Sequence, residues 1–433
     1  MGGKAAILLV LGFSLIFLVV TQYYGGLSNR AVDNSTAYYV EANAHQLAVS
    51  GANVALNQIF LDGSWSAGYS NVAMNGGEYD VTVNNISSTL KEIISTGTFQ
   101  GETKTVKIMM QPSSFAKFAW YIGNMSSKTF ITGDTVWGPF HSQSALNIEG
   151  DPVFFGKVTS LKGLNPDEKQ LAKLGYDPKF YGGYESGVDV PLPNNYEFTD
   201  QKDACIDGVA NHGGSSYFEN TDVWLEFNGD GTLTYRKGSG RDTSTYGPPT
   251  TIDQSVFAPN GVIYVDKGDL YVKGQVKGQI SIVAGESSGS GSGNVYVYDD
   301  ITYTSDPMTW DEETNNYVPN NSCSDMLGIM ATNNVRIMDN DNNNKNKNVR
   351  IDASIFCSKG GFELENINMP PSGSLYLRGG IIAAKEEIIS EVDNLGMIKN
   401  GYKKYVVFDQ RMLLAIPPHF PSTDKFEIVS WYE

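Results

Sequence analysis

The stretch GVIYVDKGDLYVKGQVKGQISIV, residues 261–283, decides the fold of most of this chain. It strings together three short runs of β-branched and aromatic residues, and Lys-Gly pairs separate them. Such residues favour strands, and glycine supplies the turns between them. Similar runs follow as NVRI at 334–337 and 348–351 and as GSLYLRGGIIAA at 373–384. Short β runs that return at turn residues predict a β-solenoid, in which each coil buries its apolar side chains against the next.

An internal repeat lies upstream of this region. ITGDTVW at 131–137 returns as IEGDPVF at 148–154, a spacing of 17 residues. We therefore expect Asp134 and Asp151 to occupy equivalent places in neighbouring coils. Because the period is irregular elsewhere, a β-sandwich with a similar number of strands is the alternative fold.

Polar and glycine-rich inserts interrupt the predicted coils near 165–250, 284–294, 305–324 and 338–348. In the first insert, Asn165 to Gly175 predicts a short helix with an N-cap, a first-turn proline and a C-terminal glycine. VWLEFNGDGTLTYR at 223–236 predicts a hairpin that turns at Asn228 to Gly231. The stretch 284–294 predicts a flexible loop, and DNDNNNKNKN at 339–348 predicts a solvated tip.

The N-terminus has a different character. Lys4 precedes an uncharged apolar run from Ala5 to Val20, and two tyrosines follow at its far edge. A hydrocarbon core of ~30 Å takes about 20 residues, so with the tyrosines as an interfacial anchor the run predicts a membrane helix. The single lysine orients it with its N-terminus inside and its C-terminus outside. A cleaved secretory signal is the alternative.

The following segment, residues 37–60, carries a helical stripe of small and apolar residues. A stripe of alanine and glycine allows close packing, either against a sheet of the same chain or against helices of other subunits. The residues predicted to act in assembly are Ala44, Leu47, Ala48, Gly51, Ala52 and Ala55. The runs around Tyr79–Val83 and Val106–Met110 alternate between apolar and polar residues and predict a small antiparallel sheet.

The predicted fold is therefore α+β and mainly β. Residues 1–62 are predicted as an apolar and then amphipathic helix, 63–112 as the small sheet, and 113–433 as the solenoid body.

KAAILLVLGFSLIFLVV, ANAHQLAVSGANVAL and the strand series after them resemble type IV pilin-like proteins, above all minor pilins of the PilX and GspK types. The resemblance covers roughly residues 1–110. Pilins carry a glutamate at the fifth position after the processed glycine, and this apolar run has no acid; the GspK-like members also lack it. The resemblance thus implies a minor or tip subunit. PSSFAKFAWYIGN and the aromatic runs after it are similar to an uncharacterised bacterial family of large surface or exported proteins.

Charge and motifs exclude several other functions. With 31 basic and 48 acidic residues the net charge is −17, which argues against nucleic acid as a partner. No nucleotide-binding or hydrolase motif is present, and His45, His141, His212 and His419 lack metal-ligand spacing.

Among 113–184, clustered aromatic residues predict mostly core, with an exposed subset that could stack on sugars. Cys323 and Cys357 could form a disulfide, which leaves Cys205 unpaired.

We expect no enzyme activity and no cofactor, apart from a structural calcium ion at Asn228–Gly231 or Asp339–Asp341. The predicted function is a pilin-like subunit of a cell-surface or extracellular filament. Its expected partners are copies of itself or related subunits, the inner membrane before assembly, and surface glycans. The alternatives are an anchored surface or adhesion protein that does not polymerise, and a carbohydrate-active β-helix enzyme that uses Asp134 and Asp151.

Overall fold

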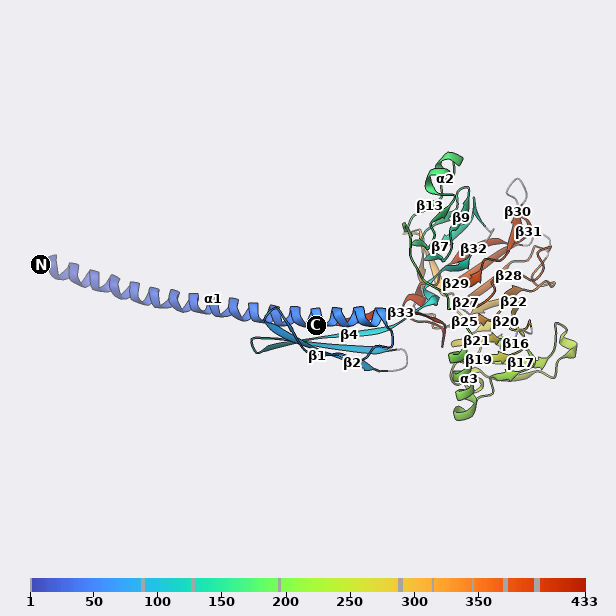
Figure 1. Ribbon diagram of the computed structural model, residues 1–433, viewed down its shortest axis with the longest axis horizontal. Coiled ribbons are helices and arrows are strands. Elements are labelled where there is room, and N and C mark those ends of the chain that lie inside the picture. Colours follow the sequence, from blue (N-terminus) through green and yellow to red (C-terminus); the bar gives the residue numbers. More distant parts are fainter. Residues whose placement is uncertain are drawn as a thin grey trace. The chain divides into compact units, whose positions relative to one another are not determined.

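The computed structural model describes residues 2–86, 90–125, 129–193, 196–286, 291–313, 315–344, 346–368, 373–392 and 398–433. The chain divides into two compact units: one combines Met1–Ser113 with Asp424–Glu433, and the other is Ser114–Thr423. Figure 1 shows the elements of each. The predicted long N-terminal helix with a mainly β body is confirmed.

The first unit consists of one helix and one sheet. Helix α1 runs from Gly2 to Leu61, 60 residues, which corresponds to about 90 Å of α-helix. The sheet has the order β1-β2-β3-β4-β33, and β1 to β4 pair antiparallel. Its strands are β1 (Tyr69–Met74), β2 (Gly77–Asn85), β3 (Lys91–Phe99), β4 (Glu102–Ser114) and β33 (Ser422–Tyr432).

β33 corrects one predicted boundary. All of 113–433 was predicted to belong to the solenoid body, whereas the last strand, β33, pairs with β4 in the small sheet. The alternation in β33 has no local feature that names its partner, so only the fold could reveal this return.

The second unit is built from coils whose strands pair parallel with the strands of the next coil. The first of its three stacks runs through ten strands. In spatial order these are β15 (Tyr217–Glu219), β19 (Val262–Asp266), β21 (Gln279–Gly285), β25 (Met326–Ala331), β27 (Val349–Cys357), β29 (Ser374–Lys385), β5 (Trp120–Asn124), β8 (Phe140–Ser142), β11 (Val158–Ser160) and β14 (Tyr184–Ser186).

Two further parallel stacks complete the coils. The second contains β16 (Asp222–Asn228), β20 (Leu270–Val276), β22 (Val295–Tyr303), β26 (Val335–Ile337) and β28 (Phe362–Leu364). The third contains the end of β22, the first halves of β27 and β29, and then β32 (Lys403–Val407), β7 (Thr135–Trp137), β10 (Val153–Phe154) and β13 (Lys179–Phe180). Parallel pairing between coils is what the solenoid prediction requires, and it differs from the antiparallel sheets of a sandwich.

The order of the coils in space differs from their order in the chain. β29, near the C-terminus, pairs with β5, the first strand of the unit, through Ile381 and Trp120. The chain therefore enters in the middle of the stack and builds outward to β14. It then crosses to β15 and builds back to the middle.

The remaining elements are short. Three two- to four-residue strands pair parallel, namely β6 (Phe130–Ile131), β9 (Leu146–Glu149) and β12 (Leu164–Asn165). The antiparallel additions are β17 (Thr232–Gly238) with β18 (Thr250–Asp253), β23 (Met308–Asp311) with β24 (Asn316–Pro319), and β30 (Ser390–Val392) with β31 (Ile398–Gly401). The helices are α2 (Glu168–Leu174), α3 (Thr199–His212), α4 (Gln254–Phe257) and the 3₁₀ turns η1 (Phe115–Lys117), η2 (Thr243–Thr245) and η3 (Gln410–Leu413).

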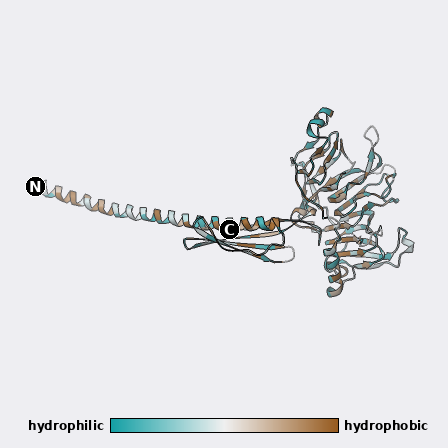
Figure 2. Cartoon of the chain, in the orientation of Figure 1, coloured by the Kyte–Doolittle hydropathy of each residue, from teal (hydrophilic) through white to brown (hydrophobic). Residues whose placement is uncertain are grey.

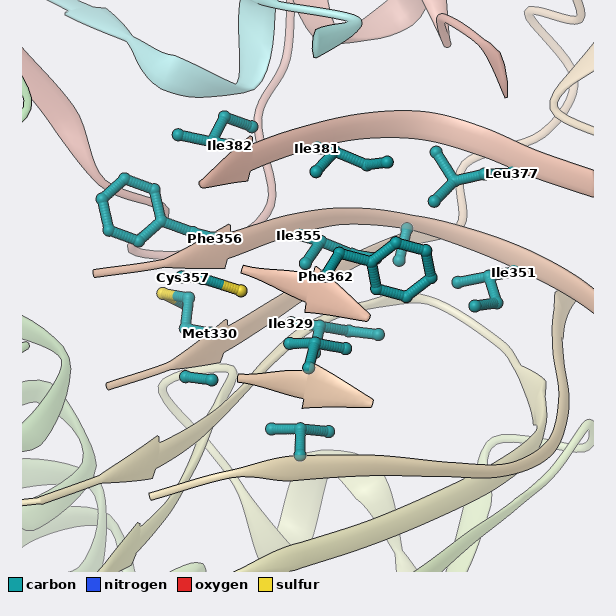
Figure 3. Packing of buried hydrophobic residues seen from close by; sticks show 14 of the residues in the cluster. Ile329, Met330, Ile351, Ile355, Phe356, Cys357, Phe362, Leu377, Ile381 and Ile382 are labelled. Carbon is teal, nitrogen blue, oxygen red and sulfur yellow. The ribbon is translucent and has the colours of Figure 1, made fainter. Parts of the chain in front are cut away.

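Ladders of identical or similar apolar residues fill the coils. Ile329, Ile355 and Ile381 pair in successive strands and are almost fully buried, as Figure 3 shows. Burying such a side chain stabilises the fold by about 1.5–3 kcal/mol. Each coil can bury its side chains only against the neighbouring coils. This explains why the stack is stable although each coil is short.

The outer side of the first stack is also buried, because the crossing segment after β14 covers it. The Tyr121 hydroxyl donates to the Val190 carbonyl at 2.7 Å. The rings of Tyr196 and Phe198 contact Phe356 at centroid distances of 5.5 and 5.8 Å. Strand β27 of this stack is therefore buried on both sides.

Several local predictions are confirmed and others are wrong. The hairpin turns between β16 and β17 as predicted. α2 ends at Gly175, which has φ 75°, but its N-cap is Asp167, whose side chain accepts from the Gln170 N–H. The 305–324 insert forms the β23–β24 hairpin. The predicted loop 284–294 lies in part outside the described residues.

The predicted solvated tip at 339–348 is wrong at its centre. Asn343 is fully buried, and its amide donates to the carbonyls of Val297 and Met338, both at 3.0 Å. Asparagine can turn inward here because its side chain satisfies backbone oxygens that the insert would otherwise bury unpaired.

Candidate functional site

The N-terminal part of α1 is the most exposed apolar surface in the described chain. Every residue from Gly3 to Tyr39 is exposed. The most hydrophobic window of this helix has a mean hydropathy of 2.5 and is entirely unburied, so by length and composition the helix could cross a membrane. Figure 2 shows the hydrophobic residues along this part of the chain. The predicted membrane segment from Lys4 and Ala5 to Val20 lies within it.

The exposed surface continues beyond the run of membrane length. Val32 and Tyr38 are 61% and 74% exposed. Between Lys4 and Arg30 the helix carries no charged residue. A helix that served only as an anchor needs no apolar side chains at positions past the interface.

The second half of α1 packs on its own sheet. Ala44, Ala48, Ala52 and Ala55 are 0% exposed, and Leu47 is 4% exposed. They face β2 and β3, and their cluster includes Tyr79, Val81 and Ile93. Small side chains let the helix axis approach the sheet closely, as the stripe predicted.

The stripe is therefore buried against the sheet of its own unit, the first of the two packing partners that the sequence left open. Gly51 shows how little room remains, since a Cβ there would come within 2.6 Å of both the Ser95 hydroxyl and the Tyr79 ring. Periodicity gave the buried face of α1 correctly, but it could not say whether the partner was a sheet of the same chain or another subunit.

An ion pair ties the start of the packed half to the sheet. The Lys104 ammonium pairs with the Glu41 carboxylate. The hydrogen bond and positive charge of Lys104 lower the pKa of Glu41. Both side chains are solvated, so the pair fixes orientation more than it stabilises.

Asp134 and Asp151, the two residues of the alternative carbohydrate-active enzyme, do not lie opposite each other in adjacent coils. Thr135 pairs with Val153 and Phe140 with Val158, so the coil spacing is 18 residues where the sequence predicted 17. This offset places Asp134 opposite Pro152. Asp134 accepts the Ile131 N–H at 3.1 Å, and Asp151 accepts the Asp177 N–H at 2.7 Å. Asp134 therefore closes its own turn, whereas Asp151 binds the backbone of the next coil.

The candidate calcium loops also make turns. Asp230 accepts both the N–H and the hydroxyl of Thr232, at 2.8 and 2.7 Å. Among the described residues, no group of three or more His, Cys, Asp or Glu side chains could hold a metal ion. Cys205, Cys323 and Cys357 are free and buried, so the suggested Cys323–Cys357 disulfide is not formed.

An aromatic cleft in the second unit was predicted only in part. Trp137 and Phe155, which belong to the predicted aromatic cluster of 113–184, stack at 3.7 Å. The same cavity is also lined by four aromatic residues outside that cluster: Trp310, Tyr317, Tyr376 and Tyr405. Residues this far apart in sequence meet only because β32 stacks on β7.

No protein-family model matches the chain, and no curated protein matches it. Among solved structures, the chain is similar to the competence-associated pilin ComZ from Thermus thermophilus, with 11% sequence identity and a TM-score of 0.35. The similarity covers 91% of this chain and 97% of that one.

Proposed function

We propose that the protein is a pilin-like structural subunit of a cell-surface or extracellular filament. The exposed half of α1 is held in the membrane before assembly and then packs against the same helix of other subunits. The folded β units are carried outside. The subunit takes a minor or tip position.

One observation carries this proposal: α1 is a single helix whose packed half continues without a break into an exposed apolar half. Because the helix is unbroken, the orientation of its packed half fixes the orientation of its exposed half. Exposed apolar side chains such as Val32 and Leu27, past the membrane run, are costly in water and gain by burial between subunits.

The absence of acidic residues in the membrane run supports a minor or tip position in the filament. In Ala5–Val20 no carboxylate is available to pair with a neighbouring subunit's terminus. Association would then rest on apolar packing alone, which suits a subunit that begins or caps a filament.

Val32→Asp tests assembly separately from anchoring. The change lies outside the membrane run and outside the packed half of α1, so membrane insertion and folding should persist. Burying an unpaired carboxylate between helices costs several kcal/mol, so we expect this chain to disappear from sheared surface filaments. Immunogold electron microscopy and immunoblotting of the sheared and membrane fractions measure this.

Val256→Asp is the matched control, because Val256 is 57% exposed on α4 of the second unit. It should leave filament incorporation unchanged. An anchored protein that never polymerises would be absent from sheared filaments in wild type and in both variants, and that result would overturn the proposal.

A further inference from the structure

A cavity of about 520 Å³ opens on the third stack of the second unit. Its floor consists of small or aliphatic side chains of adjacent coils, including Thr135, Val153 and Val407. Six of its eleven lining residues are aromatic: Trp137, Phe155, Trp310, Tyr317, Tyr376 and Tyr405.

Two parallel ring pairs border this floor. Trp137 stacks on Phe155 with 14° between the planes, and Tyr376 stacks on Tyr405 at 5.2 Å with 12° between the planes. Parallel rings arise because equivalent side chains of successive coils adopt the same direction. Within each pair the rings turn one face toward each other, and the outer faces of Phe155 and Tyr405 meet Tyr181 and the Lys403 ammonium, so the pairs present mainly ring edges to the cavity.

The β23–β24 hairpin supplies a further wall. Trp310 and Tyr317 meet edge to face at 5.0 Å, and both contact Trp137 in the same manner. Trp310 is nevertheless 46% exposed. A tryptophan at this exposure on a two-stranded hairpin gains little from the fold and is available to a ligand.

Three phenolic hydroxyls are among the uncharged polar groups of the cavity lining. Among the described residues, the phenolic hydroxyls of Tyr317, Tyr376 and Tyr405 make no hydrogen bond within the chain. They lie on the aromatic walls and can donate to or accept from a ligand. Rings with free hydroxyls bind molecules that present both apolar C–H faces and hydroxyl groups.

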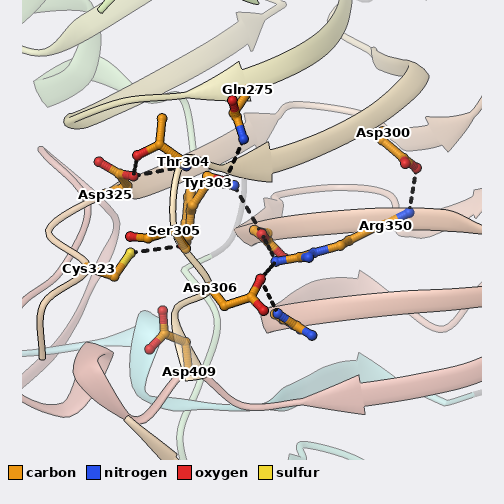
Figure 4. Close-up of polar contacts among 12 residues, drawn as sticks. Gln275, Asp300, Tyr303, Thr304, Ser305, Asp306, Cys323, Asp325, Arg350 and Asp409 are labelled. Atoms are coloured by element: carbon orange, nitrogen blue, oxygen red, sulfur yellow. Dashed lines mark hydrogen bonds and ion pairs between the residues drawn. The ribbon is translucent and has the colours of Figure 1, made fainter. Parts of the chain in front are cut away.

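The one charged residue that lines the cavity is already neutralised. Arg378 pairs with Asp306 at 2.9 Å, and Asp306 also pairs with Arg350 at 2.5 Å, as Figure 4 shows for the second pair. Burial raises the pKa of Asp306, but the hydrogen bonds and charges of Arg350 and Arg378 outweigh this and lower it. Arg378 is therefore ion-paired although its Nη1 makes no hydrogen bond, and a neutral ligand would leave this pair intact.

We infer that this cavity binds a neutral oligosaccharide of β-linked hexoses, whose flat C–H faces would stack on the exposed Trp310 indole and whose equatorial hydroxyls would pair with the tyrosine hydroxyls. A purely apolar ligand would bury the tyrosine hydroxyls without partners, which is costly. The cavity volume suits about two sugar rings. The site is independent of assembly, because every lining residue lies in the second unit.

Isothermal titration calorimetry of the full chain with cellohexaose tests this inference. The detergent must lack a sugar headgroup, since a maltoside would compete for the site. We expect saturable binding, and roughly tenfold weaker binding in Trp310→Ala and in Tyr376→Ala. Tyr405→Phe removes only a hydroxyl and should weaken binding several-fold.

Tyr38→Ala is the matched control, because Tyr38 is exposed on α1 and should leave the affinity unchanged. Circular dichroism checks that each variant is folded. Absence of heat at about 10 mM cellohexaose would overturn the inference. Equal affinity of wild type, Trp310→Ala and Tyr376→Ala would overturn it as well, since the sugar would then bind elsewhere.

Discussion

Gly97 on β3 lies directly beneath Ala48 of α1: a Cβ on Gly97 would come within 2.4 Å of the Ala48 backbone nitrogen and 2.3 Å of the Ala44 carbonyl oxygen. Helix and strand thus touch backbone to backbone, and only glycine fits on the strand. This contact converts the alanine stripe from a possible assembly surface into the core of the first unit.

Ala48→Phe should therefore disrupt the first unit itself. Overpacking typically costs about 1–3 kcal/mol, and a rigid backbone contact places this site at the upper end. Hydrogen exchange measured by mass spectrometry should show lost protection in β3. Asn53→Phe, on the exposed side of the same helix, is the control. Native protection of β3 in Ala48→Phe would show that the stripe can accept a bulky side chain.

Arg411→Met should destabilise the second unit strongly. Arg411 and Asp409 are buried, their side chains pair at 2.6 Å, and Arg411 also donates to the Asp325 carbonyl at 3.0 Å. Removing the cation leaves a buried carboxylate without its partner, which costs about 3–5 kcal/mol. Urea unfolding measures the loss.

Lys157→Met is the control for that variant, because Lys157 pairs with Glu185 and both side chains are more than half exposed. Its expected cost is about 0–1 kcal/mol. Equal losses of unfolding free energy in the two variants would mean that the buried Arg411–Asp409 pair stabilises the second unit no more than an exposed pair does.

Glu386 should make stability depend on pH. Burial raises the pKa of Glu386 to about 7 from its ordinary 4.5, although the charge of Lys404 opposes the shift. A raised carboxyl pKa stabilises the fold below about 4.5, and this contribution is lost as pH rises through about 7. Glu386→Gln should thus lose less stability than wild type between pH 5 and pH 8.

Urea unfolding at both pH values gives the comparison. Glu185→Gln, at an exposed carboxyl, should track wild type. If Glu386→Gln and wild type lose the same free energy of unfolding, the Glu386 carboxyl is not titrating in this range.

The three thiols should be unreactive in the folded protein. Cys205, Cys323 and Cys357 are free and buried, and burial raises the pKa of Cys357 to about 12. The thiolate is the reactive form, so a thiol reagent at pH 8 should label none of them until denaturant is added. Three labelled thiols after denaturation exclude a disulfide; one would indicate that a bridge forms.

The sequence by itself determined the features that depend on neighbouring residues. The uncharged run Ala5–Val20 requires a helix with an apolar surface, and Asn228–Gly231 requires a tight turn between two strands. The spacing of Ala44, Ala48 and Ala52 marks one face of α1 for close packing. Local periodicity and turn chemistry act over a few residues, so these features need no knowledge of the rest of the fold.

Only the tertiary structure decided what those features meet. It places β29 beside β5, β33 beside β4, and the alanine stripe on β3. It also joins Trp137 to Trp310 across one cavity. A parallel strand pair accepts many apolar partners with nearly equal energy, so the order of coils follows from the packing of the whole stack, and no local pattern specifies it.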